Sequence, residues 1–132
     1  MLIQIDTLSV TPIYEQLRNQ IVFGIASGRL SPGEALPSVR RLAADLGINL
    51  HTVNKSYASL SDEGYVAMDR RKGAVIAGGS TNNEEFAARL VDKLILAAAE
   101  GICHAIKEKE FIDICKSCYR QAKGSVEHQI IA

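Results

Sequence analysis

Residues 38–64, SVRRLAADLGINLHTVNKSYASLSDEG, predict two short helices joined by a tight turn. Ser38 is a suitable N-cap for the first helix, and Gly47 is of a residue type that ends helices. Asn49 is a suitable N-cap for the second helix, which continues until Gly64 terminates it. The apolar side chains expected to face the core are Val39, Leu42, Ala43, Leu46, Val53, Tyr57 and Leu60.

Another helix precedes this pair, and a β-hairpin follows it. Over residues 12–27 apolar side chains recur every four positions, which predicts an amphipathic helix with Thr11 as its cap. Residues 65–69 and 74–77 are short strand-like runs on either side of a basic turn at 70–73. The order helix, helix, tight turn, helix, hairpin is typical of a winged helix-turn-helix domain.

A segment rich in Gly, Ser and Asn, residues 78–83, is the expected linker between a first domain, 1–77, and a second module, 84–132. In the second module, apolar residues at spacings of three and four predict a helix of about 24 residues. A further helix is expected to end near Gly124, and residues 125–132 are expected to fray. The expected fold class is therefore mainly α with a small β-hairpin: a winged helix-turn-helix domain followed by a two-helix C-terminal module.

The long helix of the second module is too apolar to be stable alone in water. We expect its apolar stripe to pack both on the other helix of the same module and on a partner chain, as a dimerisation surface. The residues of this stripe are Phe86, Leu90, Leu94, Ala98 and Ile102.

Composition limits the classes of protein that the chain can belong to. The 132 residues exclude a large α/β enzyme with its own cofactor domain. With 47% hydrophobic and 23% charged residues, the chain is expected to fold. The formal net charge is zero, so a nucleic-acid partner has to be argued from where the cations lie and not from bulk charge.

The sequence also indicates a compartment. The first ten residues lack the charged and apolar regions of a signal peptide, and the longest apolar run, around 94–99, is far short of the roughly 20 residues of a membrane span. Three cysteines cannot form a fully paired disulfide framework. We therefore expect a cytoplasmic chain with reduced thiols and no membrane contact.

A winged helix-turn-helix meets DNA at three places: the first turn of its third helix, the start of its second helix and the tip of the hairpin. The polar and basic residues at these places are Asn49, His51, Thr52, Asn54 and Lys55, then Arg40 and Arg41, then Arg70, Arg71 and Lys72. Each group has an alternative interpretation. The cations of 70–72 can form a solvated turn, Arg40 can cap its helix or pair with Asp45, and His51 can be an ordinary surface residue.

Residues 12–77 resemble the DNA-binding domain of the GntR family of bacterial transcriptional regulators. The matching stretches are PIYEQL (12–17), IASGRLSPGEALPSVRRLA (25–43), LGIN (46–49), TVNKSY (52–57) and LSDEGYV (60–66). The resemblance implies DNA contacts at Arg40, Asn49, Thr52, Asn54 and a wing contact from Arg71 to Gly73. Two positions depart from the common pattern: Leu50 replaces an arginine of many members, and Arg71 replaces the first glycine of a Gly-x-Gly wing.

The second module is similar to that of the YtrA subfamily, in which a short helical tail serves dimerisation. The resemblance implies a regulator encoded beside membrane-transporter genes that it represses. Together with the apolar stripe, it favours a homodimeric, sequence-specific repressor of double-stranded DNA with a palindromic operator. No cofactor is expected, and the sequence identifies no effector ligand.

Two other classes of protein fit the sequence less well. A winged-helix protein-interaction module without specific DNA binding fits the neutral charge equally well, but not the polar third helix and basic wing. An enzyme is not expected, since the chain has no Ser-His-Asp spacing, no phosphate-cradling glycine loop and no carboxylate pair in a plausible pocket.

A metal site is a further candidate. Cys103, His104, Cys115 and Cys118 are four soft ligands of the kind that zinc prefers. Small residues buried where two helices pair explain the same pattern. Our prediction is that no metal is bound.

Overall fold

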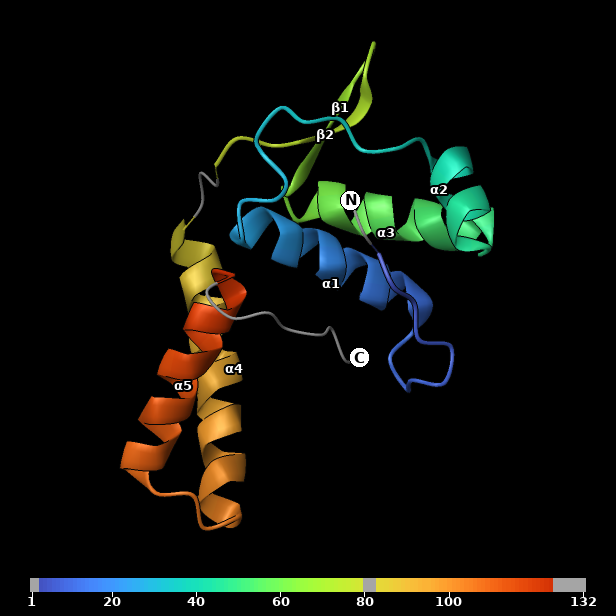
Figure 1. The fold of residues 1–132 in the computed structure, drawn as a ribbon. Helices are drawn as coiled ribbons and strands as arrows, with labels where there is room; N and C mark the ends of the chain where they lie inside the picture. The colour runs from blue at the N-terminus through green and yellow to red at the C-terminus, as the bar shows by residue number, and fades with distance from the viewer. Residues whose placement is uncertain (1–2, 80–82, 125–132) are drawn as a thin grey trace.

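The computed structural model describes residues 3–79 and 83–124. Residues 80–82 of the expected linker and the expected frayed tail, 125–132, lie outside the described residues. The elements follow one another as α1 (Ile13–Ala26), α2 (Val39–Leu46), α3 (Leu50–Asp62), β1 (Val66–Asp69), β2 (Gly73–Ile76), α4 (Asn83–Cys103) and α5 (Glu108–Ala122). Figure 1 shows a head made of α1 to β2 and an arm made of α4 and α5. The predicted fold class is confirmed.

The core of the head lies where α1 and α2 pack against α3. Leu17, Ile21, Val53 and Leu60 are completely buried there, as their helical spacing predicts. The hairpin and the loop before α2 add Leu30, Leu36, Val66, Ala74 and Ile76 to the same core. All three helices and the hairpin therefore share one hydrophobic core.

Local capping explains where α2 and α3 begin. The Ser38 Oγ accepts a hydrogen bond from the backbone N–H of Arg41 at 3.1 Å, and Asn49 Oδ1 accepts one from His51 at 2.7 Å. Gly47 ends α2 in the left-handed conformation, with φ at 67°, which a glycine adopts without strain. These three sequence predictions are confirmed.

The predicted cap of α1 is wrong. Pro12, which was expected to lie inside the helix, is extended at ψ 147° and occupies the N-cap position, and no side chain caps the helix. The Pro12 carbonyl starts the helical ladder by accepting from Glu15 and Gln16. Thr11 lies one residue too far out, and its carbonyl instead accepts from the side chain of the buried Gln16 at 2.9 Å.

The hairpin pairs β1 with β2 in antiparallel register, from Val66 opposite Ile76 to Asp69 opposite Gly73. The loop before α2 adds to the free edge of β2, where the Leu36 N–H donates to the Ala74 carbonyl at 2.8 Å. The sequence did not predict this third segment. It connects the wing directly to the start of α2.

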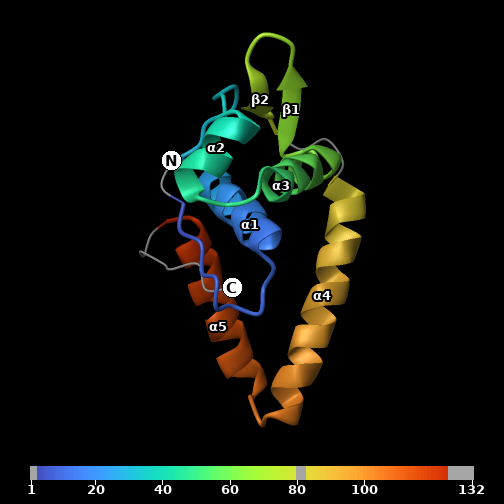
Figure 2. The ribbon, with the colours of Figure 1, turned by 90° about the vertical axis from the view of Figure 1, so that its right-hand side faces the viewer.

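The two helices of the arm diverge from a joint at residues 104–107, as Figure 2 shows. Gly101 is buried in the joint, where a Cβ on it would lie 3.7 Å from Ile106 and from Phe111. The expected long helix stops earlier than Ile106, because Ala105 has a φ of 64° and turns the chain. The expected packing of α4 on α5 is therefore confined to the joint.

In the described part of the chain, four of the five residues predicted for the apolar stripe of α4 are exposed, and Ala98 is half-buried. Phe86, Leu90 and Leu94 are between 41% and 44% exposed, and Ile102 is 73% exposed. No described residue of α5 is buried.

No helix among the described residues has the length and hydropathy required to cross a membrane.

The arm lies close to the head at two places, the end of α5 and Lys93 in the middle of α4. A Cβ on Gly124, just after α5, would lie 3.2 Å from Cβ of Ser27 at the end of α1. The positive charge of Lys93 on α4 contributes to lowering the pKa of Glu63 at the end of α3. The arm therefore extends from the ends of α1 and α3 that lie away from α2 (Figure 1).

Candidate nucleic-acid interface

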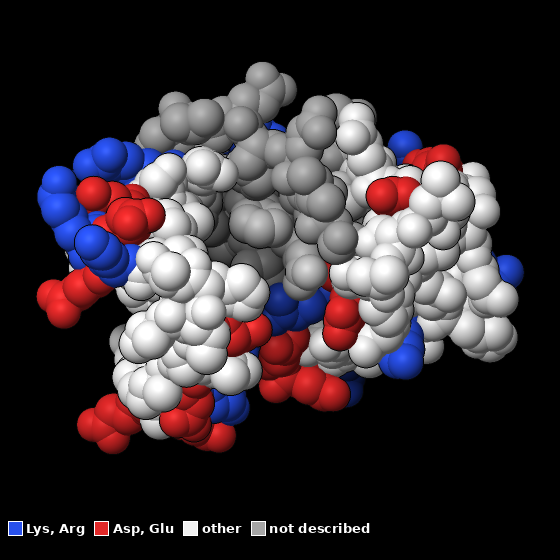
Figure 3. Space-filling model, turned by 90° about the horizontal axis from the view of Figure 1, so that it is seen from below, with Lys and Arg blue, Asp and Glu red and all other residues white. Residues whose placement is uncertain are grey.

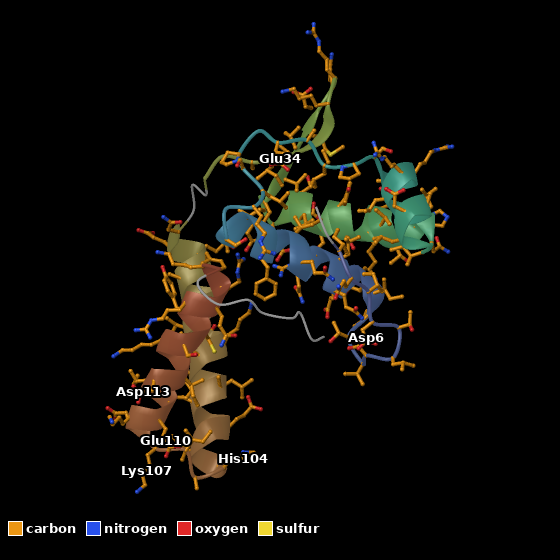
Figure 4. All side chains as sticks on the ribbon, in the orientation of Figure 1. Asp6, Glu34, His104, Lys107, Glu110 and Asp113 are labelled. Carbon is orange, nitrogen blue, oxygen red and sulfur yellow. The ribbon has the colours of Figure 1, made fainter. Side chains whose placement is uncertain are left out.

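The three regions predicted to meet DNA belong to the head, on the side away from the arm. Figure 1 shows the hairpin pointing away from α4 and α5, with α2 and the start of α3 at the end of the head opposite the arm. The loop of Glu34 lies near the base of the hairpin in Figure 4, whereas His104 and Lys107 lie at the far joint of the arm. DNA and a partner chain can thus be bound at separate surfaces.

The start of α3 divides into an outer and an inner face. His51, Asn54 and Lys55 are exposed, and Thr52 is half-buried. On the inner face, Ser56 is completely buried and its Oγ donates to the Tyr14 carbonyl of α1 at 2.6 Å. The contact with α1 holds the inner face of α3 in place. The polar side chains on its outer face are then presented together, as reading base edges in a major groove requires.

Asn49 has a structural role as well as its predicted DNA contact. Its Oδ1 is used in capping α3 through the His51 N–H at 2.7 Å. Asn49 is exposed, and its Nδ2 group can still donate to an acceptor. The cap therefore orients the amide at the tip of the recognition helix.

Lys55 lies on the side of α3 that faces the beginning of α1. Its Nζ is 4.0 Å from the centre of the Tyr14 ring, a cation–π contact. Tyr14 itself is half-buried. Lys55 is exposed, so its ammonium group remains accessible to an anion from solvent.

The two arginines of α2 differ. Arg41 Nε lies 3.8 Å from Asp45 Oδ2, with both side chains largely exposed. The alternative in which Arg40 pairs with Asp45 is therefore wrong, because the spacing of four residues brings Asp45 to Arg41. Arg40 is exposed and pairs with no carboxylate among the described residues, which leaves it available for a phosphate.

The wing tip is held by a residue that sequence reasoning missed. Asp69 Oδ1 accepts from the backbone N–H groups of Arg71 at 2.7 Å and of Lys72 at 3.0 Å. Hydrogen bonds from Lys72 and Arg71 lower the pKa of this carboxyl. An aspartate placed two residues before the tip of a turn was the available signal.

These bonds give the basic tip one shape. Gly73 follows with a φ of 76°, a conformation in which a larger residue would be strained. Arg70, Arg71 and Lys72 are exposed around the turn. The wing thus presents three cations on a backbone that is already ordered.

The four thiol and imidazole candidates do not form a metal site. Cys103 and Cys118 are exposed and Cys115 is half-buried, which also contradicts their interpretation as buried pairing residues. His104 Nδ1 lies 2.8 Å from the Glu100 carbonyl. Within residues 3–79 and 83–124, no three His, Cys, Asp or Glu side chains are grouped to hold a metal.

A polar recognition helix, a free arginine on α2 and an ordered basic wing define a winged helix-turn-helix DNA-binding regulator. Residues 12–76 match the family model of bacterial regulatory proteins, gntR family. The chain belongs to the GntR family of DNA-binding transcriptional regulators, as its sequence indicated. This is a family of transcription regulators and not of enzymes.

Similar regulators cover much of the chain. HTH-type transcriptional regulator Rv1152 of Mycobacterium tuberculosis is 32% identical over 100 residues, which are 76% of this chain and 83% of that protein. HTH-type transcriptional repressor YtrA of Bacillus subtilis is 43% identical over 76 residues, 58% of each chain. The predicted likeness to short YtrA-type regulators is thereby confirmed.

Solved structures extend the likeness to the fold. YtrA from Sulfolobus acidocaldarius, a GntR-family transcription factor, has a TM-score of 0.61 at 40% identity, covering 74% of this chain and 99% of that one. A transcriptional antiterminator from Listeria monocytogenes EGD-e has a TM-score of 0.87 and covers 98% of both chains. Its 24% identity shows a shared fold and no more.

Proposed function

We propose that the protein is a homodimeric repressor that binds a palindromic operator. The observation that carries this proposal is that a winged helix-turn-helix head is joined to an arm whose apolar side chains are exposed among the described residues. The relative from Bacillus subtilis is named a transcriptional repressor, which supports the same mode of action here. Transporter genes are candidate targets by resemblance to the YtrA subfamily.

The proposed DNA contacts divide by chemistry. Asn49, Thr52 and Asn54 are proposed to read base edges, because amide and hydroxyl groups at the start of α3 can donate and accept there. His51 and Lys55 flank them on the exposed surface of the same helix. The proposed phosphate contacts are Arg40 and Arg41 on α2 and the wing residues Arg70, Arg71, Lys72 and Gly73.

The arm supports the proposed dimer. Apolar side chains that are at least 40% exposed occur along both of its helices: Phe86, Leu90, Val91, Leu94, Ile95, Leu96, Ile102, Ile112, Ile114 and Tyr119. An exposed apolar surface of this extent is typical of a protein–protein interface. The two helices diverge from their joint (Figure 2), and the exposure of these side chains makes them available to the arm of a second copy.

The distribution of charge is consistent with separate surfaces for DNA and partner. On the side viewed from below, Lys and Arg are interspersed with Asp and Glu and lie between broad uncharged areas (Figure 3). At the wing, by contrast, three cations are consecutive. We therefore expect modest affinity for random DNA and tight binding only when two heads are engaged.

A gel-shift titration tests the proposal on the DNA upstream of the gene and on random DNA of equal length, at several salt concentrations. We expect a clear preference for the upstream DNA, with two chains per duplex and an affinity that falls as salt rises. Equal binding to both duplexes would contradict sequence-specific regulation. Light scattering of the free protein tests the dimer independently, since a monomer would contradict that part alone.

A further inference from the structure

The hydroxyl group of Tyr57 makes a hydrogen bond between two parts of the head that are distant in the sequence. Tyr57 lies on α3 and is 5% exposed, so its ring is part of the core. Its hydroxyl donates to the carbonyl of Pro37 at 2.7 Å, across 20 residues. A phenylalanine ring would fill the same space, so the hydroxyl group is not required for packing.

Pro37 is the residue immediately before the N-cap of α2. On one side, the Leu36 N–H donates to the Ala74 carbonyl of β2 at 2.8 Å. On the other side, the Oγ of Ser38 accepts from the Arg41 N–H in the first turn of α2. The three-residue segment 36–38 is therefore hydrogen-bonded in turn to the wing, to α3 and to α2.

The segment determines where the first turn of α2 lies. Arg40 is the second residue of α2 and is exposed. Its backbone position follows from the position of residues 37 and 38, because α2 is short and begins at them. The hydrogen bond from the Tyr57 hydroxyl links the residue before the N-cap of α2 to α3. Thr52 and Asn54 lie on that same helix.

We propose that Tyr57 is a positioning residue for DNA binding: its hydroxyl holds the first turn of α2, and with it Arg40, in register with α3. This inference rests on the proposed phosphate contact of Arg40. It explains why a buried position that packs on apolar neighbours carries a hydroxyl group. The ring supplies the packing, and the hydroxyl sets the distance between the proposed phosphate contact and the proposed base contacts.

The hydroxyl group is suited to this role at any pH at which DNA binding is measured. Burial raises the pKa of Tyr57 to about 12, so the phenol stays protonated and keeps donating. The Pro37 carbonyl accepts this bond at 2.7 Å, a normal length for an O–H donor. The donor therefore stays protonated over the pH range in which DNA binding is measured.

A double-mutant cycle tests the proposal. Tyr57→Phe and Arg40→Ala are made singly and together, and affinity for the upstream DNA is measured for all four proteins at one salt concentration. We expect each single variant to weaken binding by about threefold to tenfold. When position 57 is already Phe, we expect the fold-loss of DNA affinity caused by Arg40→Ala to be less than half of the fold-loss that it causes in the wild-type protein. The reason is that the arginine is then no longer held in place.

The matched control is the same cycle with Arg71→Ala in the wing. The turn that carries Arg71 is held by Asp69 at the far tip of the hairpin. We therefore expect Arg71→Ala to weaken binding by the same factor with Tyr57 and with Phe at position 57. Coupling to Arg71 as large as coupling to Arg40 would mean a general loss of structure and would overturn the proposal. Independent effects of Tyr57→Phe and Arg40→Ala would also overturn it.

Two further outcomes separate this inference from the proposed function. If Tyr57→Phe leaves affinity unchanged while Arg40→Ala weakens it, the positioning role is wrong and the phosphate contact stands. If Arg40→Ala alone has no effect, the phosphate contact fails and the positioning role fails with it. The thermal unfolding midpoint of each variant is measured in the same buffer, and the cycle is run well below the lowest midpoint.

Discussion

Arg18 on α1 and Glu63 at the end of α3 form a two-point ion pair, with Nε to Oε2 at 2.9 Å and Nη2 to Oε1 at 2.8 Å. The Ser59 Oγ also donates to Glu63 Oε2 at 3.2 Å, and the guanidinium group lies 5.5 Å from the Tyr65 ring centre. The hydrogen bond from Arg18 is the largest cause that lowers the pKa of the Glu63 carboxyl, and Lys93 of α4 contributes. The pair therefore joins the end of α3 to α1, at a point that the charge of Lys93 on α4 reaches.

This ion pair predicts a pH-dependent contribution to stability. A carboxyl whose pKa is lowered by folding stabilises the native state above its unfolded pKa, about 4.3 for a glutamate, and loses that contribution as pH falls through the folded pKa. Because the two side chains are 24% and 40% exposed, we expect Glu63→Gln to cost no more than about 1 kcal/mol at pH 7. The measurement is urea unfolding of both proteins from pH 7 to pH 3.

The expected signature is the convergence of the two proteins in acid. At pH 7 the variant is less stable, and below the folded pKa the difference between them disappears. Asp45→Asn is the matched control, because its partner Arg41 is 3.8 Å away and both side chains are more than 60% exposed. A difference for Glu63→Gln that stays constant down to pH 3 would contradict an electrostatic origin.

Asn49 predicts a separation of stability from specificity. Asn49→Ala removes the Oδ1 that accepts from His51 and is expected to cost about 0.5–2 kcal/mol of the free energy of unfolding. Asn49→Ser keeps a capping oxygen and removes the amide donor, so we expect stability near that of the wild type and an altered base preference. Chemical unfolding and a selection of bound sequences measure the two effects. Unchanged base preference in Asn49→Ser would remove Asn49 from the base contacts.

We expect the removal of the Asp69 carboxylate to weaken DNA binding, although charge alone would predict tighter binding. Removing a negative charge beside a phosphate should tighten binding, yet Asp69→Ala also removes the acceptor for the Arg71 and Lys72 N–H groups. We expect the loss of the ordered turn to dominate, with several-fold weaker binding of Asp69→Ala. Asp69→Asn keeps an acceptor and loses the charge, so it should bind as well as the wild type or better.

The same gel-shift titration compares the two Asp69 variants with Arg71→Ala. Arg71→Ala is expected to weaken binding to all sequences and to reduce the salt slope by about one. A salt slope unchanged in Asp69→Ala would show that the cations are retained and only their placement is lost. Tighter binding of Asp69→Ala would mean that the turn needs no carboxylate to present its cations.

Local signals explain why much of the head could be predicted. Capping by Ser38 and Asn49 and chain reversal at Gly47 depend on residues within four positions of each other, so a sequence contains everything that decides them. The Thr11 cap failed for a similarly local reason: the extended conformation of Pro12 moved the start of the helix by one residue.

The features that were missed bring together residues that are distant in the sequence. Arg18 and Glu63 are 45 positions apart, and the Tyr57 hydroxyl meets Pro37 across 20 positions. Periodicity assigned Tyr57 to the core but could not assign an acceptor to its hydroxyl, because that depends on how α2 is placed on α3. A polar atom on a predicted core residue is a signal that such a partner exists.

The arm shows the limit of periodicity in another way. The spacing of Phe86, Leu90 and Leu94 correctly predicted a helix with one apolar face. It did not predict that α5 would diverge from that face, since a periodic pattern specifies a surface and not what covers it. Because residues of the stripe are exposed in the single chain, a substitution in the stripe can test the predicted dimer contact directly.

The last prediction concerns this stripe. Leu94 lies midway along α4 and is 44% exposed in the single chain. A carboxylate at this position would be buried without a partner in a dimer, so we expect Leu94→Asp to yield monomers by light scattering at micromolar concentration. Asp92→Ala, two residues away and on the opposite side of the helix, is the matched control and should remain dimeric. Operator affinity should fall by about a hundredfold or more in Leu94→Asp, because the second head no longer binds at high effective concentration. A dimeric Leu94→Asp protein would move the interface away from α4, whereas a monomer with full operator affinity would show that one head is sufficient for recognition.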